Sequence, residues 1–334
     1  MAYFYLLNGK VRLLFPGVFV AIITGLAALF LSEHYGAPAM LFALLLGIAM
    51  SFLYQNTQCQ SGIEFTACHI LRVGVALLGL RIAMDDLVTL GWQSALLLIF
   101  AILSTILFGV IMARAFGLSR RFGALTGGSV AICGASAAMA ISAVLPQSKH
   151  QERDTLLTII GVTSLSTIAM VVYPILSAYL HLNPTETGLF IGGTIHDVAQ
   201  VVGAGYSISQ ETGDLATLTK LVRVAYLMPV VLCFLLVLKL RKKDLRDSGK
   251  ALGIPGFLIA FVILMALNSS VALPEVVTST ATEFSRFALV VSIAAIGMKS
   301  NLAQLTQVGM KPIILMIAET GWIAFIILGW LLLN

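Results

Sequence analysis

Two polar segments interrupt an otherwise apolar chain, and the first of them is suited to proton or ion chemistry. It reads GGTIHDVAQVVGAG, Gly192 to Gly205, and it carries His196, Asp197 and Gln200. A histidine beside a carboxylate can exchange protons near neutral pH. A charged side chain at membrane depth costs at least ~2.5 kcal/mol, so it persists only where it faces protein or water. We therefore expect His196 and Asp197 to couple a proton or another ion, and Gln200 to bind a substrate.

The second polar segment combines small hydroxyl residues with glycines that weaken a helix. It reads GGSVAICGASAAMA, Gly127 to Ala140. A broken helix presents free N–H groups at the start of its second half, and these favour an anion. The alternative is that small residues only allow close helix packing. The hydroxyls expected at the site are Thr126, Ser129, Ser136 and Ser142, and the glycines expected to open the helix, beside Cys133, are Gly127, Gly128 and Gly134.

Charged residues elsewhere in apolar segments are further candidates. Arg72 lies mid-segment and needs a carboxylate, backbone carbonyls or an anionic substrate as partner. Asp197 could instead be its structural partner. Arg223 either reaches the interface or joins the site, and Glu319 either lies within the last span or faces a subunit of a homodimer. The residues assigned to binding a small anion are Arg72, Ser129, Cys133, Gly134, Ser136, Gln200 and Arg223.

Composition places these residues in a bilayer. Hydrophobic residues make up 59% of the 334 positions and charged residues 10%, whereas soluble domains carry about 25% charged residues. We expect an all-α integral membrane protein, one transmembrane domain over residues 1–334, with about eleven spanning helices. The expected spans are 14–31, 38–54, 64–81, 91–113, 123–145, 155–180, 187–207, 217–238, 255–272, 282–299 and 312–333.

Loop charges predict the orientation. Basic residues gather in alternate connections, as in the run Lys239 to Lys250, whereas the others carry acids such as Asp85 and Asp86. Loop 146–154 is an exception to this pattern. The positive-inside rule then places the N-terminus in the cytoplasm and, with an odd number of spans, the C-terminus in the periplasm of a bacterial inner membrane.

Several function classes are disfavoured. The net charge of +5 is scattered over short loops, which argues against a nucleic-acid partner. No glycine-rich run is followed by the lysine that a phosphate-binding loop needs, so direct ATP drive is not expected. Cys59, Cys68, Cys133 and Cys233 show no metal spacing and are expected to be free thiols. No cofactor is expected.

A faint internal repeat is also present. Ala76 to Leu87 aligns with Ala294 to Leu305, pairing Gly79 with Gly297 and Arg81 with Lys299. The two segments lie seven spans apart and would cross the membrane in opposite directions. Inverted repeats of this kind are typical of secondary transporters, although a chance match between apolar helices is equally compatible with the alignment.

Four motifs together resemble the YeiH-type family of bacterial inner-membrane proteins, which are labelled sulfate exporters. They are Leu71 to Arg81, Ile132 to Ala138, the Gly192 segment, and Leu218 to Pro229. The resemblance implies inverted repeats, interrupted crossing helices and elevator-like movement. The resemblance implies that the fifth and tenth spans are the crossing helices. The polar residues of the Gly192 segment instead favour the helix of that segment as part of the site. The motif residues carried over are Arg72, Arg81, Cys133, Gly134, Ser136, His196, Asp197, Gln200, Lys220 and Arg223; Lys299 and Glu319 lie outside the motifs.

The leading hypothesis is a secondary active transporter of a small anion, such as sulfate or a sulfonate, coupled to a proton or another ion. An anion channel is the second option, and a continuous polar stripe along several helices would favour it. The third is an intramembrane enzyme using Cys133 or Ser136 with His196 and Asp197, which requires the cysteine and the histidine within hydrogen-bond reach.

Overall fold

A computed structural model describes residues 2–35, 39–80, 84–146, 150–241, 256–270, 274–300 and 309–333. Throughout these ranges the regular secondary structure is helical. Seven of the described helices are long and apolar enough to cross a membrane. They are Arg12–Tyr35, Thr57–Leu78, Gly91–Ala115, Arg153–Tyr179, Gln210–Val237, Glu275–Lys299 and Met310–Leu333.

The chain, expected to form one transmembrane domain, packs as two compact units. The first comprises Met1–Leu87, Val202–Asp214 and Pro255–Asn301. The second comprises Val88–Val201, Leu215–Ile254 and Leu302–Asn334. Each unit therefore gathers segments that lie far apart in the sequence.

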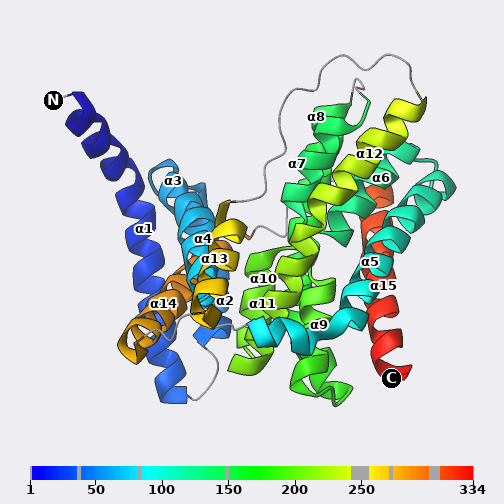
Figure 1. The fold of residues 1–334 in the computed structure, drawn as a ribbon. Coiled ribbons are helices and arrows are strands. Elements are labelled where there is room, and N and C mark those ends of the chain that lie inside the picture. Colours follow the sequence, from blue (N-terminus) through cyan, green and yellow to red (C-terminus); the bar gives the residue numbers. More distant parts are fainter. Residues whose placement is uncertain are drawn as a thin grey trace. The chain divides into compact units, whose positions relative to one another are not determined.

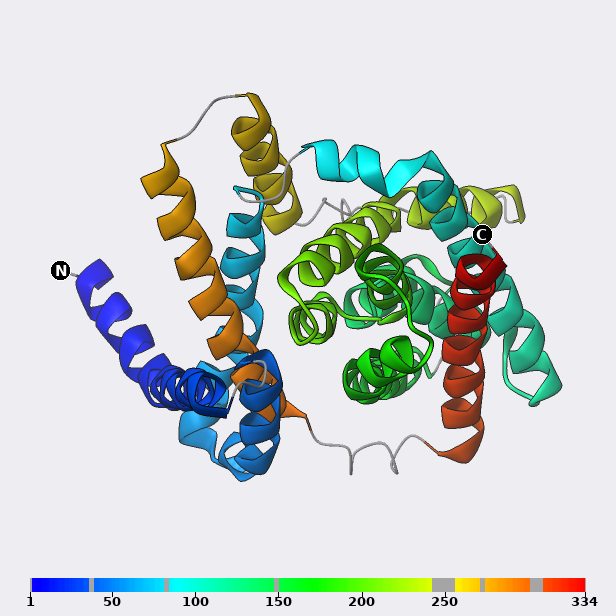
Figure 2. The same cartoon turned by 90° about the horizontal axis from the view of Figure 1, so that it is seen from below.

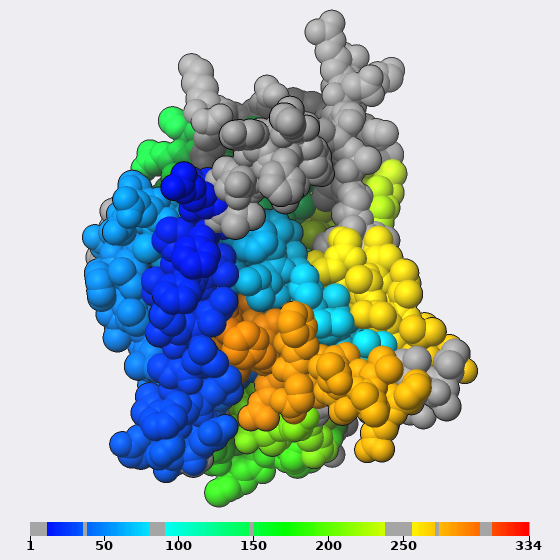
Figure 3. Space-filling model, turned by 90° about the vertical axis from the view of Figure 1, so that its left-hand side faces the viewer, coloured from blue at the N-terminus to red at the C-terminus, as the bar shows by residue number. Residues whose placement is uncertain are grey.

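The first unit is organised around α14 (Glu275–Lys299). α1 (Ala2–Tyr35), α2 (Ala39–Ala49) and α4 (Leu71–Leu78) all pack against it. Figure 1 labels these helices, and Figure 3 shows α1 and α14 side by side on one face of this unit. The unit also contains η1 (Ser51–Gln55), α3 (Thr57–Phe65), the π-helical turn η2 (Thr66–Ile70) and α13 (Gly256–Ser270).

Glycines set the close approach of helices in the first unit. A Cβ on Gly47 of α2 would lie 2.9 Å from the Cα of Gly297 in α14. A Cβ on Gly17 of α1 would lie 2.7 Å from the Cα of Gly62 in α3. Small residues that let backbones touch are the usual means of helix association in lipid.

The second unit surrounds two interrupted helices. α6 (Arg120–Ala131) is followed by α7 (Ala135–Val144), and α9 (Pro184–Thr194) is followed by α10 (Val198–Tyr206). α15 (Met310–Leu333) packs against both first halves, and Figure 2 shows it running beside α9. The other helices with residues in this unit are α5 (Met84–Ala115), α8 (Gln151–Tyr179), α11 (Gln210–Ala225) and α12 (Leu227–Arg241).

The interruptions do not fall at the glycine pairs, contrary to our expectation. Gly127 and Gly128 lie inside α6, and Gly192 and Gly193 lie inside α9. A Cβ on Gly127 would lie 3.0 Å from the carbonyl oxygen of Thr105 in α5, so this glycine serves close packing. The breaks come later, at residues 132–134 and 195–197.

Candidate functional site

Arg223 of α11 joins the ends of the two interrupted helices. Its side chain is fully buried. Nε and Nη2 donate to the carbonyl oxygen of Ala131 at 3.0 and 2.6 Å, and Nη2 also donates to that of Val130 at 3.0 Å. Nη1 donates to the carbonyl oxygens of Gly192 at 3.0 Å and Ile195 at 3.1 Å. A guanidinium has five N–H groups, so all of them are engaged with backbone.

Lys220 lies one turn earlier on the same face of α11 and completes this arrangement. Nζ donates to the carbonyl oxygen of Ile132 at 2.6 Å and to that of Ile195 at 2.8 Å. The side chain is fully buried, and it interacts electrostatically with Asp197. The last carbonyls of a helix lack partners within the helix and carry partial negative charge. Lys220 and Arg223 supply both the donors and the compensating charge.

Small residues in α9 allow these side chains to reach the breaks. A Cβ on Gly192 would lie 2.7 Å from the Cβ of Thr219, and a Cβ on Gly188 would lie 2.6 Å from that of Leu215. Gly188 and Gly192 have the spacing of a small-xxx-small contact. The backbones of α9 and α11 are therefore close, which brings Lys220 and Arg223 to the end of α9.

The two breaks adjoin each other. Gly134, the residue before α7, has φ 61° and ψ −119°, a conformation open to glycine because it has no Cβ. A Cβ built there would lie 3.6 Å from the Cβ of His196 and 3.7 Å from its carbonyl oxygen. The first turns of α7 and α10 therefore begin beside one another. Their N–H groups have no partner within their own helices and carry partial positive charge.

Hydrogen bonds to neighbouring helices fix the second break. His196 is fully buried, and its Nε2 lies 3.0 Å from Oγ1 of Thr320 in α15. Thr320 donates its own hydroxyl hydrogen to the carbonyl of Met316 at 2.7 Å, so Nε2 is the donor to Thr320. The backbone N–H of Asp197 donates to Oγ of Ser166 in α8 at 3.2 Å.

Three buried polar atoms close to this break have no hydrogen-bond partner among the residues that the structure describes. They are Nδ1 of His196, Oε1 of Gln200 and Oγ1 of Thr219. Buried polar groups are normally satisfied. A carboxamide can present oxygen or nitrogen by turning over, so Gln200 and Thr219 are suited to holding a polar ligand.

The hydroxyls of the Gly127 segment do not converge on one point, contrary to our expectation. Ser129 is buried and donates to the carbonyl of Leu125 in its own helix. Ser142 lies 2.6 Å from Oγ1 of Thr155 in α8. Ser136 is exposed, whereas Cys133 is buried at the break. The structure thus brings Cys133 and Gly134 to the break, with Ser136 in the first turn of α7 just after it, whereas Ser129 and Ser142 bond other residues.

Arg72 belongs to the compact unit that does not contain the breaks. It lies in α4 of the first unit and its side chain is exposed. Its role in substrate binding stays a prediction. Arg81 lies outside the described residues, and Lys299 is an exposed residue in the last turn of α14.

Glu319 is the residue that the sequence left without a role. It is fully buried within the chain, and Oε1 accepts a hydrogen bond from Oγ1 of Thr126 in α6 at 2.8 Å. It therefore does not lie at a subunit surface. Thr320, the next residue, bonds His196, so one turn of α15 contacts both interrupted helices. In the sequence, the observation that could have indicated a role for Glu319 was its position as a lone carboxylate inside an apolar helix.

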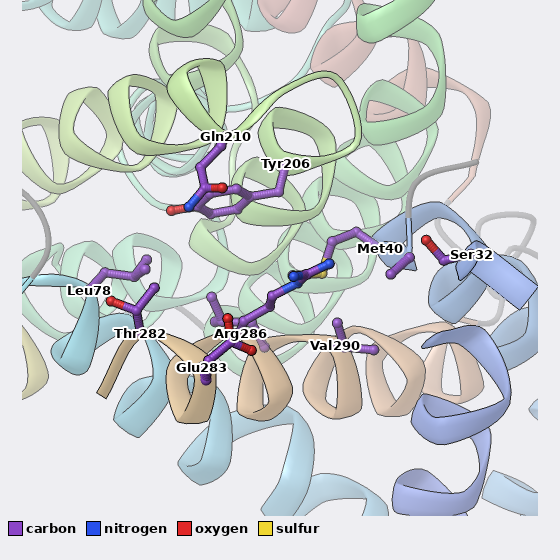
Figure 4. A pocket seen from close by; sticks show the side chains of 11 residues that line it. Ser32, Met40, Leu78, Tyr206, Gln210, Thr282, Glu283, Arg286 and Val290 are labelled. Carbon is purple, nitrogen blue, oxygen red and sulfur yellow. The ribbon is translucent and has the colours of Figure 1, made fainter. Parts of the chain in front are cut away.

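A separate pocket of about 240 Å³ lies in the first unit. Figure 4 shows Arg286 of α14 reaching between the residues of its own helix and the facing Tyr206 and Gln210. Tyr206 is held by a hydrogen bond from its hydroxyl to Asp214 at 2.6 Å. This pocket was not foreseen from the sequence, where Arg286 lies at the start of an apolar segment and resembles an interfacial residue.

A model of the family described as Conserved hypothetical protein 698 matches residues 16–316. The UPF0324 membrane protein TauZ of Paracoccus pantotrophus is 50% identical over 95% of this chain and 94% of its own length. A UPF0324 membrane protein of Chlorobaculum tepidum is 48% identical over 94% of this chain and 88% of its own. No solved structure matches.

The fold and the relatives define a multi-pass membrane protein of bacterial type. Within that class, the chain belongs to the Conserved hypothetical protein 698 family of UPF0324 membrane proteins. This confirms the YeiH-like family expected from the four motifs.

Proposed function

We propose that the protein is a secondary active transporter of a small anion such as sulfate or a sulfonate. One observation carries the proposal. Four helix ends meet at the breaks, and the two negative ends, those of α6 and α9, are occupied by Arg223 and Lys220. The two positive ends, those of α7 and α10, begin beside one another at the same place, which suits an anion.

The charge of the site supports this choice of substrate. An arginine stays protonated in proteins, so Arg223 contributes a fixed positive charge although its N–H groups are used on carbonyls. Interrupted helices at a binding site, with half-helix N-termini that face anionic groups, are characteristic of secondary transporters. Arg223, expected from the sequence to bind substrate, supports the site through its charge and its hold on the two half-helices.

Eleven spans, inverted repeats and elevator-like movement form part of the same proposal. The four expected spans beyond the seven long helices correspond to α2 with η1, α6–α7, α9–α10 and α13. In the first unit α2 packs on α14 and α13 packs on α4, while α4 and α14 pack on each other. This pairing is symmetric if α2 corresponds to α13 and α4 to α14, as the alignment of Gly79 with Gly297 requires. We place the N-terminus in the cytoplasm and the C-terminus in the periplasm.

The alternative functions have less support. An enzyme using Cys133 needs a base at hydrogen-bond distance. Within the described residues, however, His196 Nε2 bonds Thr320 and Nδ1 has no partner. A channel needs a continuous polar path, whereas the buried polar groups described form separate clusters, such as those at the breaks and around Glu319. We propose no cofactor, no nucleic-acid partner and no homodimer contact through Glu319.

The proposal is tested by binding and uptake with defined anions. Purified protein is screened by thermal shift against sulfate, methanesulfonate and small carboxylates, and reconstituted protein is tested for uptake of those that bind. We expect an oxyanion to bind, and Lys220→Gln to weaken it at least tenfold. Lys299→Gln, which changes an exposed lysine of α14, serves as the control. A folded protein that neither binds nor moves any of these anions contradicts the proposal.

A further inference from the structure

Glu319 occupies a closed polar site in the second unit, on the side of α6 toward α5 and α15. The side chain is fully buried. Oε1 accepts the hydroxyl hydrogen of Thr126 at 2.8 Å, whereas Oε2 has no partner among the described residues. Oγ1 of Thr105 in α5 is also buried without a described partner. Unsatisfied buried polar atoms of this kind call for a specific explanation.

Glycine makes the space that the carboxyl group fills. A Cβ on Gly109 of α5 would collide with Oε1 of Glu319, and it would lie 2.7 Å from the carbonyl oxygen of Gly123 in α6. A Cβ on Gly123 would lie 2.6 Å from the Cβ of Ala113. The carboxyl group therefore sits in a notch between two backbones, where a larger residue at position 109 would displace it.

No charged partner accompanies this carboxyl group in the part of the chain that the structure describes. Among the described residues its only hydrogen bond is the one from Thr126. A lone buried carboxylate costs several kcal/mol, and binding a proton removes that cost. Gly109 of α5 also lies against the carboxyl group. Thr320, the next residue of α15, bonds His196, which is the titratable side chain contacted by this turn of α15.

The position of Glu319 links it to the breaks. Thr126 lies three residues before Ser129, whose carbonyl accepts the N–H of Gly134 at the first break. Thr320 holds His196 at the second break. A change in the charge of Glu319 would alter its bond to α6, and α15 carries that change to α9–α10.

We propose that Glu319 binds and releases the proton that drives transport, in addition to Asp197 and His196. The coupling to transport rests on the proposed function, whereas the proton site on Glu319 does not. Water on one side of the membrane gives a proton to the carboxylate, which becomes a carboxylic acid, and the proton leaves to water on the other side. One O–H bond forms and breaks, and nothing is oxidised or reduced.

A transport experiment tests the coupling. Glu319→Gln keeps the carbonyl that Thr126 bonds but cannot gain or lose a proton. In proteoliposomes with an imposed pH step, we expect this variant to exchange radiolabelled sulfate yet to lose accumulation at least tenfold. Glu319→Asp is expected to retain part of it, and Glu211→Gln, at an exposed position, all of it. Native accumulation in a folded Glu319→Gln protein overturns the inference.

An infrared experiment tests the proton site without any transport. We record difference spectra between acidic and alkaline buffer and expect the carbonyl stretching band of a protonated carboxyl group, sensitive to deuterium oxide and missing in Glu319→Gln. A band present in a protein that moves no anion would refute the transport proposal and keep the proton site. Absence of any titrating band assigned to Glu319 refutes the proton site, whatever the transport result.

Discussion

Gly134 and His196 contact each other across two helices that are far apart in the sequence. A Cβ on Gly134 would lie 3.6 Å from the Cβ of His196, and Gly134 itself has φ 61°. This contact places the start of α7 beside the start of α10. The adjacent starts of α7 and α10 therefore depend on Gly134, a residue without a side chain.

Gly134→Ala is expected to destabilise the protein and to weaken anion binding. A backbone conformation with φ 61° and ψ −119° is open essentially to glycine. Holding another residue there costs about 1–3 kcal/mol, and relief of that strain would turn the start of α7. Thermal unfolding and oxyanion binding of the purified protein measure both effects. Gly329→Ala in α15 is the control, because a Cβ there meets nothing within 4 Å. Equal behaviour of the two variants would show that the Gly134 conformation is dispensable.

Arg223→Lys is expected to lower stability strongly although it keeps the charge. A lysine has three donors in place of five, and each buried carbonyl left without a partner costs about 1–3 kcal/mol. We expect a reduced yield of folded protein and a lower thermal midpoint. Arg153→Lys, at an exposed position in α8, is expected to change neither. A stable Arg223→Lys protein would mean that the two half-helices hold together without the guanidinium.

Asp197→Asn is expected to separate exchange from uphill transport. The change removes a proton carrier but leaves the backbone N–H bond to Ser166. We expect sulfate exchange to persist and accumulation driven by an imposed pH step to be lost. Accumulation at the native rate would remove Asp197 from the coupling. Loss of folded protein, rescued by replacing Arg72 with a neutral residue, would instead favour a structural pair with Arg72.

Arg286→Gln tests whether the pocket of the first unit takes part in anion binding. Arg286 reaches into this pocket beside Tyr206 and Gln210. If the pocket is a binding or entry site, the affinity or the uptake rate of sulfate falls about tenfold, since a charged hydrogen bond contributes roughly 1.5–3 kcal/mol. Arg72→Gln, at an exposed arginine of α4, is measured beside it. An unchanged Arg286→Gln protein would assign binding to the breaks alone.

The orientation is checked by labelling single cysteines in a background without native cysteines. A cysteine in the Lys239 to Lys250 run, which lies outside the described residues for the most part, is expected to be protected from an impermeant thiol reagent in intact cells. A cysteine at the C-terminus is expected to react. Equal labelling at both positions would reject the eleven-span orientation.

The sequence by itself determined the class of the protein and the two polar segments in which helices are interrupted. Hydropathy is a local property, so apolar spans can be read without knowing what they contact. Polar residues inside such spans are costly. This is why the segments containing Cys133, Gly134, His196, Asp197 and Gln200 were singled out, and a helix is interrupted within each of those segments.

Only the tertiary structure decided where the helices break and what the charged residues do. The glycine pairs were expected to open the helices, but their lack of side chains serves packing against α5 and α11. Arg223 bonds carbonyls up to 93 residues away, and Glu319 bonds Thr126 across 193 residues. Such contacts depend on which helices adjoin, and that is fixed by packing over the whole unit rather than by the pattern of any one segment.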